Sequence, residues 1–161
     1  MILLKYKLSD IKHRILQLEH PDFQEHKNYL ADLITRSTTE FVFPSWMEIS
    51  TISDFAFYGY PLTSIDIPEG VTRIGWRAFD ECYLTNITIP GSVQEIDGGA
   101  FANSGITDMY LYPTTPPTLA NTSAISNYTT TIHVPIGYGD AYKNATNWSS
   151  FANKIVEDIE I

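Results

Sequence analysis

A phrase of 22 residues recurs through the middle of this chain and limits what it can fold into. From Leu62 the sequence reads LTSIDIPEGVTRIGWRAFDECY, and from Leu84 it reads LTNITIPGSVQEIDGGAFANSG. The same step aligns Phe57 with Phe79 and Phe101. A repeat of this length indicates a stack of units, because one unit cannot bury its own apolar face. The repeat therefore predicts the continuous surface of a stack of units, and it does not by itself predict a chemical activity.

Each copy of the repeat predicts a short strand that ends at a proline. Ile65 and Ile67 alternate with Asp66, which is the period of a strand with one inward face. Pro68 lacks a backbone donor and ends the strand. Cys82 is the single cysteine and falls where the unit needs a small buried group, so we expect an inert thiol in the core.

Parallel stacking of the copies places equivalent residues in columns. We name one of these the outward column, because its members lie between the two inward residues of each strand. This face is polar and carries one exposed aromatic residue, which suits either a solvated sheet surface or a binding surface. The outward column contains Val42, Asp66, Thr88, Tyr110 and His133.

The copies follow the pattern I-x-I-P-x-x-V-x-x-I-x-x-x-A-F and resemble the BspA-like leucine-rich repeats of bacterial and protist surface proteins and of some bacteriophage proteins. The segments TPPTL (Thr115–Leu119), IHVP (Ile132–Pro135) and DAYKNATNWSSFANKI (Asp140–Ile155) resemble the closing cap of such arrays. The resemblance covers about residues 33–161, with about three regular copies. It implies a right-handed parallel solenoid used for adhesion or recognition.

The expected fold is a leucine-rich-repeat solenoid, mainly of parallel β-strands with short turns and helices, preceded by an α-helical element. The solenoid is expected over residues 39–161, with its C-terminal cap at about residues 131–161. Within the cap, residues 140–144 predict a short helix, and Trp148 is expected to cover the last coil. The segment from Thr114 to Thr131 is rich in Pro, Thr, Asn and Ser and predicts an irregular coil.

Residues 1–38 break the repeat and predict a docking or capping element. Apolar residues there alternate between spacings of three and four, as in the seam of a coiled coil. A competing pattern of a strand exists over residues 2–8, followed by a helix over residues 11–19. A second helix is predicted over residues 22–34, after Pro21. The predicted oligomerisation or docking residues are Leu4, Leu8, Ile11, Ile15 and Leu18.

Charge is distributed unevenly, which argues against nucleic acid as a partner. Residues 1–40 carry six basic and six acidic residues, whereas residues 41–161 carry four basic and thirteen acidic ones. Phosphate contacts need a basic patch, and none is expected on the repeats. No run of apolar residues is long enough to predict a membrane span, and the first residues do not resemble a secretion signal.

The sequence offers no motif of a catalytic, metal or cofactor site. Patterns of a nucleophile elbow, a phosphate-binding loop and a zinc protease are absent. The expectation is therefore a protein without enzymatic activity, metal or cofactor. Exposed aromatic residues are the remaining signal, and they are expected at turns or outward positions: Tyr58, Tyr60, Trp76, Tyr83, Tyr110 and Tyr112.

These observations together predict a binding or adhesion module with protein partners. The resemblance favours a bacteriophage virion component, in a tail or head appendage, that recognises a host surface protein or glycan. Residues 1–38 would then join it to other virion subunits or to its own copies. Two alternatives stay open: a purely structural part of the particle, and an intracellular (cytoplasmic) bacterial interaction protein. The predicted contact residues are Trp76 together with Asp66, Thr88, Tyr110 and His133.

Overall fold

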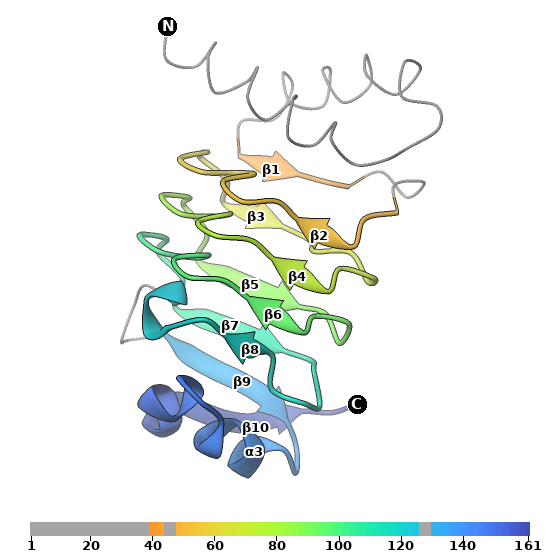
Figure 1. Ribbon diagram of the computed structural model, residues 1–161, viewed down its shortest axis with the longest axis vertical. Coiled ribbons are helices and arrows are strands. Elements are labelled where there is room, and N and C mark those ends of the chain that lie inside the picture. Colours follow the sequence, from red (N-terminus) through yellow and green to blue (C-terminus); the bar gives the residue numbers. More distant parts are fainter. Residues whose placement is uncertain (1–38, 44–47, 126–129) are drawn as a thin grey trace, which may run out of the picture.

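The computed structural model describes residues 39–43, 48–125 and 130–161 (Figure 1). The predicted helical element at residues 1–38, with its five docking residues, lies outside this described part. The described residues wind through successive coils that follow the copies of the repeat, and they end in the C-terminal cap. Figure 1 shows the coils one above another, closed at the C-terminal end by short helices.

Each regular coil contributes one strand to each of two sets of parallel strands (Figure 1). All strand pairs in the described part are parallel, as the repeat predicts. The first set comprises β1 (Glu40–Phe41) paired with β3 (Ser64–Ile65), and the sheet of β5 (Asn86–Ile89), β7 (Asp108–Leu111), β9 (Thr131–Pro135) and β10 (Ile155–Ile159). The second set is the sheet of β2 (Thr51–Ile52), β4 (Arg73–Ile74), β6 (Glu95–Ile96) and β8 (Thr118–Leu119).

The register of the sheets follows the period of the sequence. Arg73 pairs with Thr51 on one side and with Glu95 on the other, at steps of 22 residues. Glu95 then pairs with Thr118, so the Pro-rich segment adds one residue and keeps the register. This segment is less irregular than predicted, because it carries β8 and a 3-10 helix, η1 (Thr122–Ala124).

The core lies between the two sheets and contains one phenylalanine from each regular coil. Phe79 stacks on Phe57 with ring centroids 5.2 Å apart, and on Phe101 with centroids 5.3 Å apart. The backbone N–H of each ring-bearing residue donates to a carbonyl of the next coil, for example from Phe79 to Ala100 at 2.7 Å. Cys82 lies in this core as predicted, and its thiol donates to the carbonyl oxygen of Phe57.

The turn that leaves the second sheet needs two residues with positive φ in each regular coil. The first position is taken by Phe55, Arg77 and Gly99, with φ between 52° and 69°. The second position is taken by Gly59, Glu81 and Asn103, with φ between 51° and 65°. Residues other than glycine are less favourable at positive φ. Hydrogen bonds between neighbouring coils must therefore hold the turn.

The C-terminal cap closes the last coil with α3 (Gly139–Asn144), η2 (Trp148–Lys154) and β10. The short helix predicted over residues 140–144 is confirmed and begins one residue earlier. Trp148 is fully buried, and its Nε1–H donates to the carbonyl oxygen of Pro117 at 2.7 Å. Tyr142 is buried beside it and donates to the carbonyl oxygen of Pro113 at 2.7 Å. Trp148 therefore covers the last coil, as its sequence position suggested.

Candidate binding surfaces

The register brings three of the predicted contact residues side by side on the outward column. Thr88 on β5 pairs with Tyr110 on β7, which pairs with His133 on β9. Thr88 is exposed, and Tyr110 exposes 36% of its surface. Asp66 follows β3 one coil earlier and is also exposed, as is Val42 at the start of the column. The predicted alternation of inward and outward residues is thus confirmed on this sheet.

His133 is more enclosed than its position on the outward column suggested. Its imidazole stacks on the Tyr110 ring, with centroids 4.4 Å apart and an angle of 15° between the planes. Its Nδ1 lies 2.7 Å from Asp158 Oδ2, and its Nε2 lies 3.2 Å from Asp108 Oδ1. Only 14% of the side chain is exposed, because neighbouring strands place these groups around it.

The two carboxylates favour the protonated form of His133, since only an imidazolium can donate to both. Partial burial by itself lowers the pKa of His133, but hydrogen bonds to Asp158 and Asp108 outweigh it and raise the net pKa above its ordinary value. The pKa of Asp108 is lowered, first by the hydrogen bond from Thr107 at 2.7 Å and then by His133. Asp158 has no equivalent in the repeat, so the sequence gives no signal for this contact.

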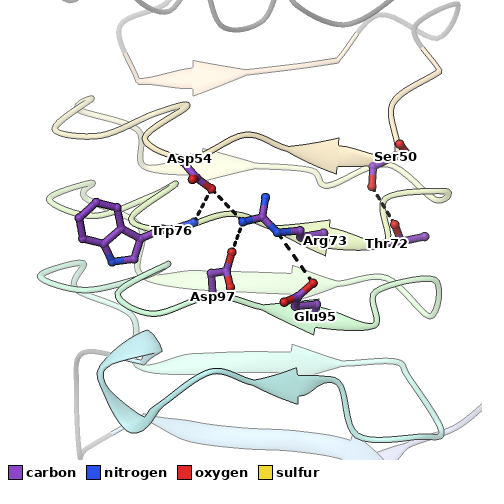
Figure 2. A network of polar contacts seen from close by, with 7 residues as sticks. All are labelled: Ser50, Asp54, Thr72, Arg73, Trp76, Glu95 and Asp97. Carbon is purple, nitrogen blue, oxygen red and sulfur yellow. Dashed lines mark hydrogen bonds and ion pairs between the residues drawn. The ribbon is translucent and has the colours of Figure 1, made fainter.

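Trp76 forms a second exposed surface, beside the end of β4 (Figure 2). Its side chain exposes 46% of its surface, as its position predicted. The Phe55 ring packs edge-on against the indole, with ring centroids 4.7 Å apart and 74° between the planes. The guanidinium carbon of Arg77 lies 5.3 Å from the centroid of the indole. The backbone N–H of Trp76 donates to Asp54 Oδ1 at 3.0 Å. We call Asp54, Phe55, Trp76 and Arg77 the Trp76 corner.

A charged network on the outer face of the second sheet adjoins the Trp76 corner (Figure 2). Arg73 forms ion pairs with Asp54 at 3.0 Å and Glu95 at 3.8 Å, and a third pair with Asp97. Glu95 and Asp97 are acidic residues that precede the turn at Gly98 and Gly99. The positive charge beside these carboxylates comes from the chain itself, because Arg73 lies one coil before Glu95 and pairs with it in register.

The outward column and the Trp76 corner belong to different sheets. Tyr110 lies on β7 in the first set of strands, whereas Trp76 follows β4 in the second. The structure therefore does not bring the predicted contact residues into a single surface. Tyr60 corrects another expectation, because it is buried with 7% of its surface exposed. Tyr83 and Tyr112 are exposed at 67% and 42%, as expected.

Other kinds of site have little support in the described part of the chain. Across residues 39–43, 48–125 and 130–161, no group of three or more His, Cys, Asp or Glu side chains is arranged to hold a metal ion. The helices described there are also too short and polar to span a membrane.

Stacked coils joined by parallel sheets, with exposed aromatic residues on their outer faces, define a repeat protein. The family model of the BspA type leucine rich repeat region matches residues 34–146 in six copies. The chain therefore belongs to the BspA-type leucine-rich repeat family, whose repeats generally serve in protein interaction or adhesion rather than catalysis. The six copies exceed the roughly three regular ones expected from the sequence. A comparison with curated proteins finds no match.

Proposed function

We propose that this protein is a non-enzymatic binding module whose coils form an open leucine-rich-repeat solenoid, and that the Trp76 corner is its principal contact surface. One observation carries the proposal. Trp76 is a large, exposed aromatic side chain that packs against Phe55, at a position where the repeat does not need one. The equivalent residues in neighbouring coils are Asp54 and Gly98, so packing of the coils does not explain a tryptophan here.

The geometry of the Trp76 corner suits an anchor of a protein interface. Phe55 and Arg77 pack against the indole, which would reduce the side-chain freedom that is lost on binding. Trp and Arg are enriched among the residues that dominate binding energy. The charged network around Arg73 supplies a polar rim beside the anchor.

The proposed setting is a bacteriophage virion, where the module would sit on a tail or head appendage and recognise a host surface protein or glycan. The occurrence of this repeat type in phage proteins supports that setting. Four residues of the outward column would add contacts on the other set of strands: Asp66, Thr88, Tyr110 and His133. The seam-like spacing of residues 1–38 supports a role of that segment in docking to virion or self subunits. A structural role within the particle, and a cytoplasmic interaction role, are the competing functions.

Replacement of Trp76 by Ala tests the proposal. We expect adsorption of the labelled full chain to whole bacterial cells, measured over a panel of species, to fall about tenfold or more, as for a hot-spot residue. The melting temperature should stay within a few degrees of the wild-type value, because the side chain is exposed. Tyr83→Ala is the matched control, since Tyr83 is an exposed aromatic residue in the same coil.

Three results would contradict the proposal. Equal adsorption of the Trp76→Ala variant and the wild type would remove the Trp76 corner from the contact surface. An absence of adsorption to every species tested would favour the structural or cytoplasmic role over host recognition. A loss of adsorption by the Tyr83→Ala control as well would point to a general effect of surface aromatic residues.

A further inference from the structure

His133 joins three strands that are far apart in the sequence. It lies on β9, between Asp108 on β7 and Asp158 on β10. β10 is the edge strand of its sheet and is paired only with β9 in the described part of the chain. The two ion pairs of His133 therefore connect the last strand of the cap to the coils beneath it.

We propose that His133 is a pH-sensitive clamp that fastens β10 to the sheet when its imidazole is protonated and releases it when the imidazole is neutral. The clamp would also hold the ring of Tyr110 in place, because the two rings are stacked at 4.4 Å. It acts on the outward column and is independent of any contact made by the Trp76 corner. It exists whether or not the outward column binds a partner.

The chemistry of the three groups requires a change between the two protonation states. An imidazolium donates one N–H to Asp158 and one to Asp108, and it separates two negative charges. A neutral imidazole keeps a single N–H, so one carboxylate then faces a nitrogen lone pair. Hydrogen bonds between charged groups are stronger than neutral ones, so deprotonation weakens both contacts.

Among the described residues around His133, no other charged group compensates for this loss. On β7, Thr107 donates to Asp108, and Tyr110 stacks on the imidazole. On β10, Val156 pairs with His133 in register, and Glu157 accepts a hydrogen bond from the backbone N–H of Gly139 at 2.6 Å. Within the described residues, no lysine or arginine forms an ion pair with either carboxylate.

The direction of the pH dependence follows from the pKa. The net pKa of His133 is raised in the folded protein, above the ordinary value of about 6.5. The stabilisation is therefore complete below the unfolded-state value and is lost as the pH rises through the folded-state value. The clamp is closed in mildly acidic solution and opens on the alkaline side of that range.

Loosening of β10 would reach the helical cap through one further contact. Glu157 on β10 accepts the hydrogen bond from Gly139, the first residue of α3. A released β10 would therefore free the start of α3 and uncover the apolar side chain of Val156 further. The state of His133 would then decide how rigid the end of the stack and the Tyr110 face are.

Hydrogen exchange and NMR on the full chain test the clamp. Histidine side-chain resonances followed from about pH 5 to pH 9 give the pKa of His133, assigned with the His133→Gln variant. We expect a value above the ordinary one. Amide protection of residues 155–159, corrected for intrinsic exchange, should fall by about threefold or more across that titration, relative to residues 86–89.

A variant of Asp158 and a control variant of Glu160 provide the comparison. Asp158→Asn should lower protection of β10 in acidic solution to about the level of the wild type in alkaline solution, and so reduce its pH dependence, because the charge at the shorter contact of 2.7 Å is lost. Glu160→Gln is the matched control, because it removes a carboxylate from the same end of the chain without touching the pairs of His133. It should behave as the wild type.

Three results would overturn the clamp. The first is a pKa of His133 at or below the ordinary value in the wild type. The second is a parallel change of protection in residues 155–159 and 86–89 as the pH rises. The third is an unchanged pH dependence in Asp158→Asn. The first two are measured on the wild-type protein and do not depend on the folding of any variant.

Discussion

At the scale of single residues, the close approach of neighbouring coils decides which side chains are tolerated. A Cβ atom added to Gly75 would lie 2.5 Å from Asp54 Oδ1 and 2.8 Å from the carbonyl oxygen of Ile52. The backbone N–H of Gly75 donates to that same carbonyl at 2.8 Å, so the chain cannot move away without losing the bond. The equivalent residue one coil later is Asp97, which shows that the restriction belongs to this coil and not to the repeat.

Replacement of Gly75 by Ala is therefore expected to destabilise the protein by about 1–3 kcal/mol, the usual cost of overpacking. Urea denaturation would measure the free energy of unfolding. Gly91→Ala is the control, because the nearest atom to its added Cβ, the carbonyl oxygen of Tyr112, lies 3.9 Å away. Equal stabilities of the two variants would mean that the coils separate more easily than their hydrogen bonds suggest.

At the scale of elements, the cap depends on buried polar groups of aromatic residues. Trp148 and Tyr142 meet edge to face, with ring centroids 5.4 Å apart, and each donates to a backbone carbonyl of the preceding coil. Burial raises the pKa of Tyr142, so its hydroxyl stays protonated and remains a donor at any ordinary pH. These two bonds attach η2 and α3 to a Pro-rich segment whose prolines supply no backbone N–H.

Replacement of Trp148 by Phe is expected to cost about 2–4 kcal/mol, since it leaves the Pro117 carbonyl without its donor and opens a small cavity. Chemical denaturation would detect the loss. Trp76→Phe serves as the control and should change stability by less than about 0.5 kcal/mol, because that side chain is exposed. A smaller effect at Trp148 than at Trp76 would rule out the role of Trp148 in closing the stack.

At the scale of the whole molecule, the coils stack through contacts between neighbours and need protection at both ends. The C-terminal end of the stack is closed by the cap. The other end begins at β1, and the sequence there predicts a docking or capping element. The acidic character of residues 41–161 makes close approach of two stacks unfavourable, so we propose that association takes place through residues 1–38.

Self-association of the full chain tests this proposal. We expect sedimentation velocity to show an oligomer that a charged substitution in the seam, Ile11→Asp, converts to a smaller species. An equivalent charge at an exposed position of the stack, Val42→Asp, should leave the oligomer intact. A monomer at high protein concentration would contradict docking through self-association and leave capping as the role of the segment.

Much of the fold could be predicted from the sequence because burial repeats with the coils. Ile65, Ile87 and Met109 are all buried at equivalent positions, and the residues that follow them, Asp66, Thr88 and Tyr110, are exposed. The outward positions of Trp76 and Tyr110 likewise predicted their exposure. The prediction for Tyr60 was wrong, because its place in a turn suggested exposure although its ring reaches the core.

The candidate sites were predicted less completely, since their partners do not repeat. Asp158 reaches His133 only because β10 returns parallel to β9 after the cap. Arg73 meets Asp54 and Asp97 across two neighbouring coils, and a single aligned column does not reveal such diagonal pairs. The positive φ of Arg77 and Glu81 cannot be inferred from these residue types themselves. The glycines at the equivalent positions, Gly99 and Gly59, are the signal that could have predicted it.

The sequence by itself determined the period, the inward residues and the family, because each inward residue recurs at the same place in successive coils. Only the tertiary structure decided that Tyr110 and Trp76 belong to different sheets, and that His133 is held between two carboxylates. The physical reason is that burial is a property of each coil, which repetition records. Ion pairs and ring stacks depend on the distances between coils, and these exist only after the coils have stacked.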